Sequence, residues 1–272
     1  MLQNVHTNYL LLRERFLKIR TVKVKNIVFL LVFGTLFTCD NDDANNCFQT
    51  SGIIVQQEVE VSSFEKILIN RDVELILNEG VEFKVIIETG KNLLNDVEVL
   101  VVDNQLQLTD NNTCNYVRGF GITKIYVTAP NITEIRSSTQ YDVSSDDVLN
   151  YNNLHLISED FNAPESFTVG DFRLNVNTMQ LRITANNISS FYITGQTENL
   201  NIGFFAGSGR FEGENLIAEN VDVFHRGSND MIVNPQQSIT GELRSTGDLI
   251  SRNQPPIVEV QQFYTGQLIF VD

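Results

Sequence analysis

The sequence has no tryptophan and only five prolines, three cysteines and three histidines among 272 residues. The absence of tryptophan excludes a carbohydrate platform built on that side chain. The scarcity of proline suits continuous β-ladders, because proline removes a backbone donor from a ladder. Two histidines follow Cys39, and their spacing is not that of a metal-binding motif. The sequence therefore predicts no metal site and no cofactor.

Basic residues are also scarce, with 19 Lys and Arg against 34 Asp and Glu, which gives a net charge of −15. Residues 1–38 hold six of the basic residues and one acid, so the rest of the chain carries a charge of −20. Nucleic acids and anionic lipid surfaces are bound mainly through Lys and Arg. The composition of the body thus argues against both partners.

No apolar run is long enough to span a bilayer, since Ile27–Thr38 has twelve residues where about 20 are needed. A basic segment followed by a short apolar segment is typical of a secretory signal peptide. The run ends at Cys39, three residues after Leu36, and this resembles a lipobox, with Thr38 where a smaller residue is usual. We expect a lipoprotein signal peptide over residues 1–38, lipid on Cys39 and an acidic tether over residues 39–52. A plain secreted protein cleaved nearby is the alternative.

Cys47 and Cys114 remain if Cys39 carries lipid. An exported protein enters an oxidising compartment, where disulfides persist. The sequence predicts a Cys47–Cys114 disulfide, with two free thiols as the alternative.

The body from residue 53 to 272 consists of short alternating or β-branched runs separated by Gly, Asn and Asp, which predicts an all-β domain. Its second half repeats. One set of apolar residues is spaced by 18 to 20 positions, and a second set has the same period. The two sets are Phe172, Phe191, Phe211, Met231 and Leu249, and Leu181, Leu200, Val221 and Ile239.

A shared period of about 19 residues predicts a right-handed parallel β-helix, in which each turn pairs with its copies and stacking supplies the core. Four turn-forming clusters fit this repeat, beginning at Arg136, Ala206, Arg226 and Arg244. A β-sandwich is the alternative, because it has similar strand spacing.

The order of short motifs resembles one known family. Phe64–Ile69, Val73–Gly80 and Val85–Leu94 resemble the opening of the auto-transporter adhesin head-GIN domain, and Ile125–Ile135 and Ser245–Ile250 resemble its middle and end. The resemblance covers roughly residues 53–270. It implies a secreted or lipid-anchored protein with a β-helical body and no established catalytic residues.

Three neighbouring aromatic pairs are candidate ligand contacts, since adjacent strand residues point to opposite faces. We expect one member of each pair in the core, and Tyr192, Phe205 and Tyr264 on the surface as stacking groups for a sugar or a protein. Packing of loops against the helix is the alternative explanation for them.

Arg226 and Arg244 should stack one turn apart, with Arg136 at the matching position, and such a ladder can bind a carboxylate or sulfate. Pairing with nearby acids is the alternative role. Asp230 and Asp248 should also stack, and a glycosidase needs two neighbouring carboxyl groups. Asp is equally favoured in turns for its own backbone hydrogen bonds.

These observations predict a non-catalytic binding or adhesion module of the cell envelope, attached to the outer membrane through lipid only. The expected partner is a glycan or a cell-envelope protein, and strand addition at Gln267–Val271 is one mode of contact. A polysaccharide lyase or glycosidase and a structural envelope lipoprotein are the alternatives. The oligomeric state stays open.

Overall fold

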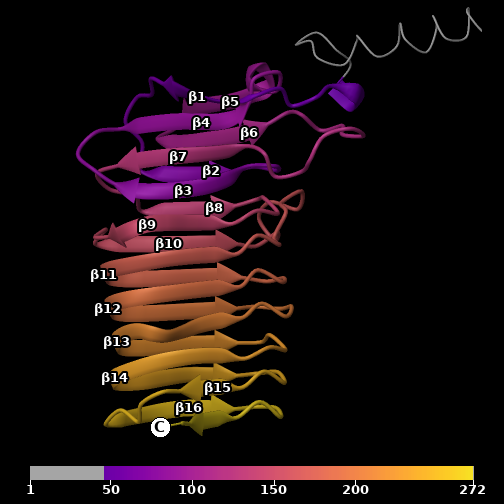
Figure 1. Ribbon diagram of the computed structural model, residues 1–272. Coiled ribbons are helices and arrows are strands. Elements are labelled where there is room, and N and C mark those ends of the chain that lie inside the picture. Colours follow the sequence, from indigo (N-terminus) through magenta and orange to yellow (C-terminus); the bar gives the residue numbers. More distant parts are fainter. Residues whose placement is uncertain (1–45, 272) are drawn as a thin grey trace, which may run out of the picture.

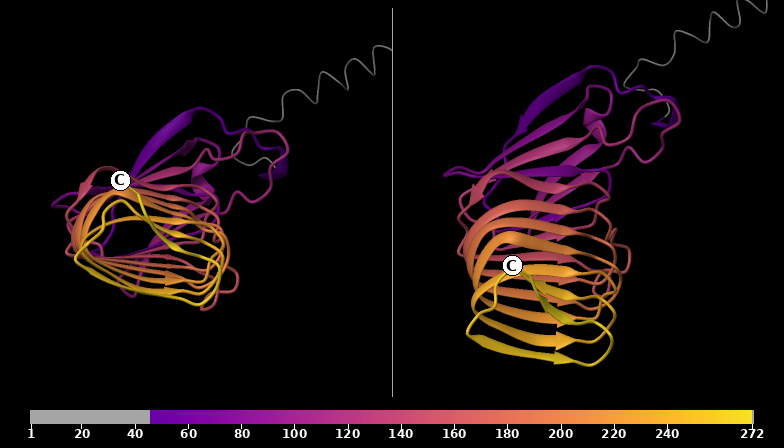
Figure 2. Two further views of the ribbon diagram at one scale, coloured as in Figure 1. Left: turned by 90° about the horizontal axis from the view of Figure 1, so that it is seen from below. Right: turned by 60° about the horizontal axis from the view of Figure 1, so that its bottom comes forward.

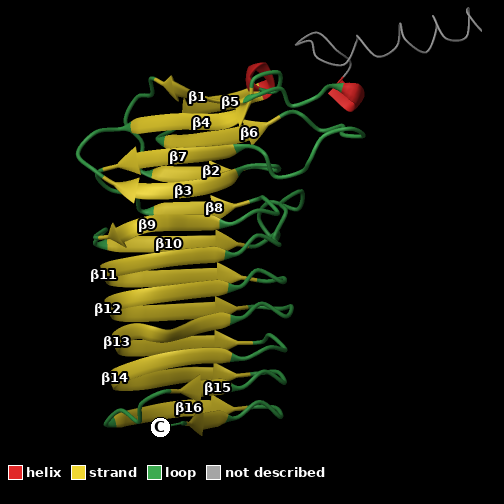
Figure 3. Ribbon diagram, in the orientation of Figure 1, coloured by secondary structure: helices red, strands yellow, loops and turns green. Residues whose placement is uncertain are grey.

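The computed structural model describes residues 46–271, and Cys39 lies outside this range. Its 17 strands form one mixed sheet, and its two helical segments are single 3-10 turns, so the all-β prediction is confirmed (Figures 1 and 3). The helical turns are η2 (Asn46–Phe48) and η3 (Leu94–Asp96). The strands are β1 (Ile54–Val59), β2 (Lys66–Ile69), β3 (Glu74–Glu79), β4 (Lys84–Gly90), β5 (Val97–Val102), β6 (Gln105–Asp110), β7 (Lys124–Ala129), β8 (Glu134–Ser137), β9 (Val143–Leu149), β10 (Asn153–Ser158), β11 (Phe172–Ala185), β12 (Phe191–Phe204), β13 (Phe211–His225), β14 (Met231–Leu243), β15 (Leu249–Ser251), β16 (Ile257–Gln262) and β17 (Leu268–Phe270).

The chain from β11 onward forms coils that stack in parallel register. Phe172 pairs with Phe191, Phe191 with Phe211, Phe211 with Met231, and Met231 with Leu249. All five side chains are fully buried, so the first apolar set of the repeat forms one column inside the stack. Figure 2 shows the successive coils lying over one another around this core.

The second apolar set behaves in the same way. Leu181 pairs with Leu200, Leu200 with Val221, and Val221 with Ile239, again in parallel. Each buried residue thus packs against the residues at the equivalent position of the neighbouring coils. A β-sandwich would need antiparallel pairing between successive strands, whereas β8 to β17 pair in parallel throughout the described chain.

The first half of the body does not stack in chain order. The coil of β2 and β3 lies between the coil of β6 and β7 and the coil of β8 and β9. Beyond β6 and β7, strands β1, β4 and β5 pair antiparallel and cover that end (Figure 1). A sequential stack from residue 53 was expected, and the structure has that order only from β8 onward.

One of the four predicted repeat clusters is out of register. Arg136 pairs with Ile157, and this column continues through Thr184, Gly203 and Phe224, not through Arg226. The prediction that Arg136 matches Arg226 and Arg244 is therefore wrong. The reason is local: Arg136 lies inside β8 and Ser138 begins the turn, whereas Arg226 and Arg244 begin theirs, so a cluster aligned by composition slips by two residues.

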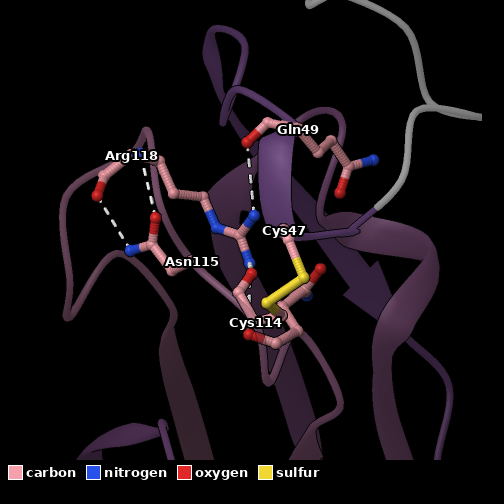
Figure 4. Close-up of a disulfide and its surroundings, with 6 residues drawn as sticks. Cys47, Gln49, Cys114, Asn115 and Arg118 are labelled. Atoms are coloured by element: carbon pink, nitrogen blue, oxygen red, sulfur yellow. Dashed lines mark hydrogen bonds between the residues drawn. A yellow bond between two sulfur atoms is a disulfide. The ribbon is translucent and has the colours of Figure 1, made fainter.

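A disulfide joins Cys47 to Cys114 at the covered end of the stack (Figure 4). Beside it, the Arg118 guanidinium donates to the carbonyl oxygens of Gln49 at 3.2 Å and Cys114 at 2.9 Å. The Gln49 side chain is buried and donates to the Asn92 carbonyl at 2.7 Å. These contacts fix the start of the described chain against the body.

Replacing a core ring should show how far stability depends on the stacked column. The ring of Phe191 is stacked on Phe172 at 4.8 Å and lies 5.8 Å from the ring of Phe204. Phe191→Ala should lower the free energy of unfolding by about 3–5 kcal/mol, because it leaves a cavity between coils. Urea denaturation measures this, with exposed Met179→Ala on β11 as the control. Equal stability of the two variants would contradict the packing described.

Removing the disulfide should also destabilise the chain. The bridge links residues 67 positions apart, and loss of such a loop closure costs about 4 kcal/mol on the chain-entropy model. The double variant Cys47→Ser, Cys114→Ser should therefore unfold at lower urea, and reductant should bring the parent to the same midpoint. An unchanged midpoint in both experiments would show that the bridge contributes nothing to stability.

Candidate ligand-binding surface

The first residues of the short turns form a column on one side of the stack. Phe205, Arg226, Arg244 and Phe263 each follow the last residue of a strand, and each backbone N–H donates to a carbonyl of the preceding coil at 2.7 to 2.8 Å. The residues before the first three, Phe204, His225 and Leu243, are buried, whereas Gln262 before Phe263 is exposed. Strand alternation therefore turns this column outward.

Phe224 joins the column from the outer face of β13. Its ring is stacked on Phe205 at 5.1 Å, and Arg244 lies over Phe263 at 4.2 Å and within 5.9 Å of Phe224. Such cation–π contacts hold an arginine flat against an aromatic face. We call Phe205, Phe224, Arg226, Arg244 and Phe263 the aromatic–arginine strip.

A hollow of about 220 Å³ lies beside this strip on the outer face of β11 to β13. Phe205 and Phe224 form its aromatic wall, and Gly203, which pairs with Thr184 and Phe224, also lines it. A Cβ at Gly203 would lie 2.7 Å from the Phe205 ring, so glycine makes room for that ring. The polar groups at the hollow come from Arg182, Thr184, Asn201 and Asp222.

The three expected aromatic contacts do not form one surface. Phe205 belongs to the strip, whereas Tyr192 lies near the start of β12 with Arg173 over its ring at 4.1 Å. Tyr264 is exposed next to Phe263 in a turn. The expectation that one member of each pair is buried holds for Phe191 and Phe204 but is wrong for Phe263, because strand alternation ends at Gln262.

Phe224 and Phe263 were missed by sequence reasoning. Phe224 stands alone beside His225 and has no aromatic neighbour in the sequence, and Phe263 was assigned to the core. The signal that identifies both is positional: Phe224 pairs with Gly203, and Phe263 occupies the same position in its coil as Phe205. The register between coils, which sequence spacing gives only approximately, brings them together.

Two of the predicted arginines, Arg136 and Arg244, form ion pairs with nearby acids. Arg244 Nε donates to Glu242 at 2.5 Å on the surface. Arg136, away from the strip, donates to Glu159 Oε1 at 2.9 Å. Burial opposes ionisation of Glu159, but the hydrogen bonds from Arg136 and Asn162 outweigh it and lower the pKa of that carboxyl. Arg226 is exposed between the two aromatic ends of the strip.

Asp230 and Asp248 stack as expected, and their carboxylates bind backbone. Asp230 Oδ1 accepts from the Asp248 N–H at 3.3 Å, and Asp248 Oδ1 accepts from the Gln267 N–H at 2.8 Å. Asp171 accepts from the Ser190 N–H at 2.9 Å in the same way. These contacts support the role of Asp as a turn residue that links one coil to the next.

A second, smaller cavity of about 60 Å³ lies near the disulfide, between Asp72, Asp110 and Arg118. Buried Asp110 accepts from Thr123 Oγ1 at 2.5 Å and from the Asn112 N–H at 2.8 Å. A cavity of this size holds a few water molecules and no sugar ring. Over residues 46–271 no group of three His, Cys, Asp or Glu side chains is placed to hold a metal ion.

Both described histidines are structural. His155 Nε2 lies 2.9 Å from Thr184 Oγ1, and His225 is fully buried below the strip. His225 Nδ1 accepts from the Gly227 N–H at 3.3 Å, and Nε2 lies 2.8 Å from the Asn229 carbonyl oxygen. This arrangement suits the neutral ring with its proton on Nε2.

The buried ring makes stability depend on pH. Burial lowers the pKa of His225 from its ordinary value of 6.5, although Asp230 and Asp248 act in the opposite direction. As the pH falls through about 6.5, the unfolded chain binds a proton that the folded chain resists. The free energy of unfolding should therefore be largest above this pH and fall below it.

His225→Leu tests this dependence, because Leu243 fills the same position in the next coil. The variant should lose part of the parent's decrease in stability between about pH 7 and pH 5, measured by urea denaturation at each pH. His155→Gln is the matched control for the other imidazole, which is half-buried and whose pKa burial also lowers. Parallel pH curves for parent and His225→Leu would exclude His225 as the cause.

Comparisons with known proteins agree with this architecture. The model of the family described as "Putative auto-transporter adhesin, head GIN domain" matches residues 63–255. A putative adhesin from Bacteroides fragilis has 20% sequence identity and a TM-score of 0.72, over 82% of this chain and 99% of that one. A putative adhesin from Parabacteroides merdae has 13% identity and a TM-score of 0.59, over 81% and 97% of the two chains.

A protein from Parabacteroides distasonis described as a putative lipid binding protein has 13% identity and a TM-score of 0.53, over 81% of this chain and 98% of that one. At these identities the solved structures establish the fold alone. No curated protein matches the sequence.

The fold is that of an all-β protein of stacked coils, with a hollow on its outer face. Because the family model covers more than half of the chain, the chain belongs to the auto-transporter adhesin head-GIN domain family. Membership indicates a non-catalytic binding module of the cell surface or envelope. Within residues 46–271 no helix has the length and apolar character needed to cross a membrane.

Proposed function

We propose that this protein is a glycan-binding adhesion module, held at the outer membrane by lipid on Cys39. The sequence before Cys39 supports the anchor through its basic segment, short apolar run and lipobox-like ending. The chain enters the described body at η2, next to the disulfide. The coils, and the strip on them, therefore extend away from the anchored end.

The observation that carries the glycan assignment is the hollow beside Phe205 and Phe224. Aromatic faces pack against the C–H faces of sugar rings, and amide, carboxylate and guanidinium groups bind hydroxyls in fixed directions. The hollow combines both kinds of group, because Arg182, Asn201 and Asp222, which pair across three coils, line it together with the two rings. Its volume of about 220 Å³ is below the roughly 300–1,000 Å³ of drug-sized pockets, so the proposed contact is with one ring of a glycan.

An enzyme of the lyase or glycosidase class is the second candidate. It needs a pair of free carboxyl groups flanking a glycosidic bond. The stacked pair Asp230 and Asp248 already accepts backbone hydrogen bonds, which favours binding without cleavage. A purely structural lipoprotein is the third candidate, and it predicts that the hollow has no ligand.

A glycan array on purified residues 40–272, with and without calcium, tests the proposal. Phe205→Ala and Phe224→Ala should each weaken binding to a recognised glycan by about tenfold, the effect of losing an aromatic anchor. Gly203→Val should do the same by filling the hollow. Phe161→Ala is the matched control, since this exposed ring lies outside the hollow.

The outcomes separate the three candidates. Binding that depends on Phe205 and Phe224 without product supports the adhesion module. Cleavage of a bound glycan establishes the enzyme. If no glycan on the array is bound, or if none of the three variants changes the binding, the glycan assignment is overturned.

A further inference from the structure

Two exposed arginines beside the hollow, Arg182 and Arg226, form no ion pair with any described residue. The other arginines of residues 46–271 have partners. Arg71 lies over the Phe167 ring, and Arg118 donates to carbonyl oxygens beside the disulfide. The remaining five form ion pairs with acids: Arg136, Arg173, Arg210, Arg244 and Arg252.

Both unpaired arginines border the hollow. Arg182 lines it from β11. Arg226 follows the end of β13, two residues after Phe224. Its backbone N–H donates to the Phe204 carbonyl at 2.8 Å, so Arg226 neighbours Phe205 in the stack, at roughly the 4.8 Å spacing of paired strands. One unpaired guanidinium thus lies among the lining residues, and the other lies beside the aromatic wall.

The next coil shows why Arg226 has no acid partner. Arg244 occupies the equivalent position there, and Glu242, two residues before it, accepts from its Nε. In the coil of Arg226 the position of Glu242 is taken by Phe224, which pairs with Glu242 in register. A phenyl ring cannot form an ion pair, so the same residue supplies part of the aromatic wall and leaves Arg226 without a counter-charge on its own coil.

The charge at the hollow differs from that of the whole chain. Three outward positions on each of β11, β12 and β13, with the first residue of each following turn, hold Arg182, Arg226 and one acid, Asp222. Asp222 already accepts from Thr240 Oγ1 at 2.9 Å. These nine positions therefore carry a charge of +1 in a chain of −15. The acids at the same positions of the two neighbouring coils are both held by arginines: Glu159 by Arg136 and Glu242 by Arg244.

An unpaired guanidinium selects for an anion. Its planar set of donors matches a carboxylate or sulfate, and such charge-assisted hydrogen bonds are roughly twice as strong as those to neutral groups. Building on the glycan-binding function proposed above, we propose that the ligand of the hollow is an acidic glycan. One sugar ring packs against Phe205 and Phe224, and Arg226 and Arg182 bind the carboxylate or sulfate groups of the glycan.

An array that holds neutral, uronate-bearing and sulfated glycans tests this inference on residues 40–272, which include every described residue. We expect the acidic glycans to be bound. The carboxyl-reduced or desulfated form of each bound glycan should bind at least about tenfold more weakly, the effect of losing hydrogen bonds between charged groups. The treatment that weakens binding identifies the anion as a uronate or a sulfate.

Substitution of the arginines links the preference to this site. Arg226→Gln should lower the affinity for a bound acidic glycan by at least about tenfold and leave the affinity for its neutral form unchanged. The double variant Arg182→Gln, Arg226→Gln should bind the acidic and neutral forms equally. Arg173→Gln is the matched control, because it removes the same charge from an exposed arginine outside the hollow that Asp142 and Asp171 already hold.

The results separate this inference from the function on which it rests. If neutral glycans bind as tightly as acidic ones and need Phe205 and Phe224, the acidic ligand is excluded and the glycan-binding module stands. A preference for acidic glycans that the double variant keeps also overturns the inference, because another surface then binds the anion. Absence of all binding overturns both proposals.

Discussion

Parallel pairing of each coil with the equivalent strands of its neighbouring coils is the constraint on which the rest of the molecule depends. Once Phe172 pairs with Phe191 and Leu181 with Leu200, every residue between them is assigned to the inside or the outside of the stack. A slip of one residue would turn the buried columns to solvent, so the apolar core fixes the register. The same register then stacks Phe205, Arg226, Arg244 and Phe263 on the surface. The candidate binding surface is thus a consequence of core packing.

The acidic residues of the chain have a structural use. Asp171, Asp230 and Asp248 each accept a backbone N–H from the next coil, and Glu159 and Glu242 hold arginines. These five carboxylates therefore link neighbouring coils or fix side chains on them. The hollow on the outer face has a different composition, since it combines Phe205 and Phe224 with Arg182, Asn201 and Asp222.

The inner columns could be predicted from sequence because burial requires an apolar residue at a fixed period, and Phe191, Phe211 and Met231 keep that period. The strip was only partly predictable, since a surface position such as Phe224 obeys no period and is recognised only when Gly203 is known to lie beside it. Arg136 was misaligned because it lies inside β8, two residues before the turn that Ser138 begins, and composition does not mark that boundary. The crossed order of β2, β6 and β8 depends on pairings 39 and 68 residues apart, which no local pattern records.

The order of the coils gives the proposed module a direction. The described chain begins at the end covered by β1, β4 and β5, so a lipid on Cys39 would place that end toward the membrane. The hollow lies on the outer face of β11 to β13, several coils away from that end. A ligand in the hollow would therefore be met on the side of the stack, clear of the anchored end.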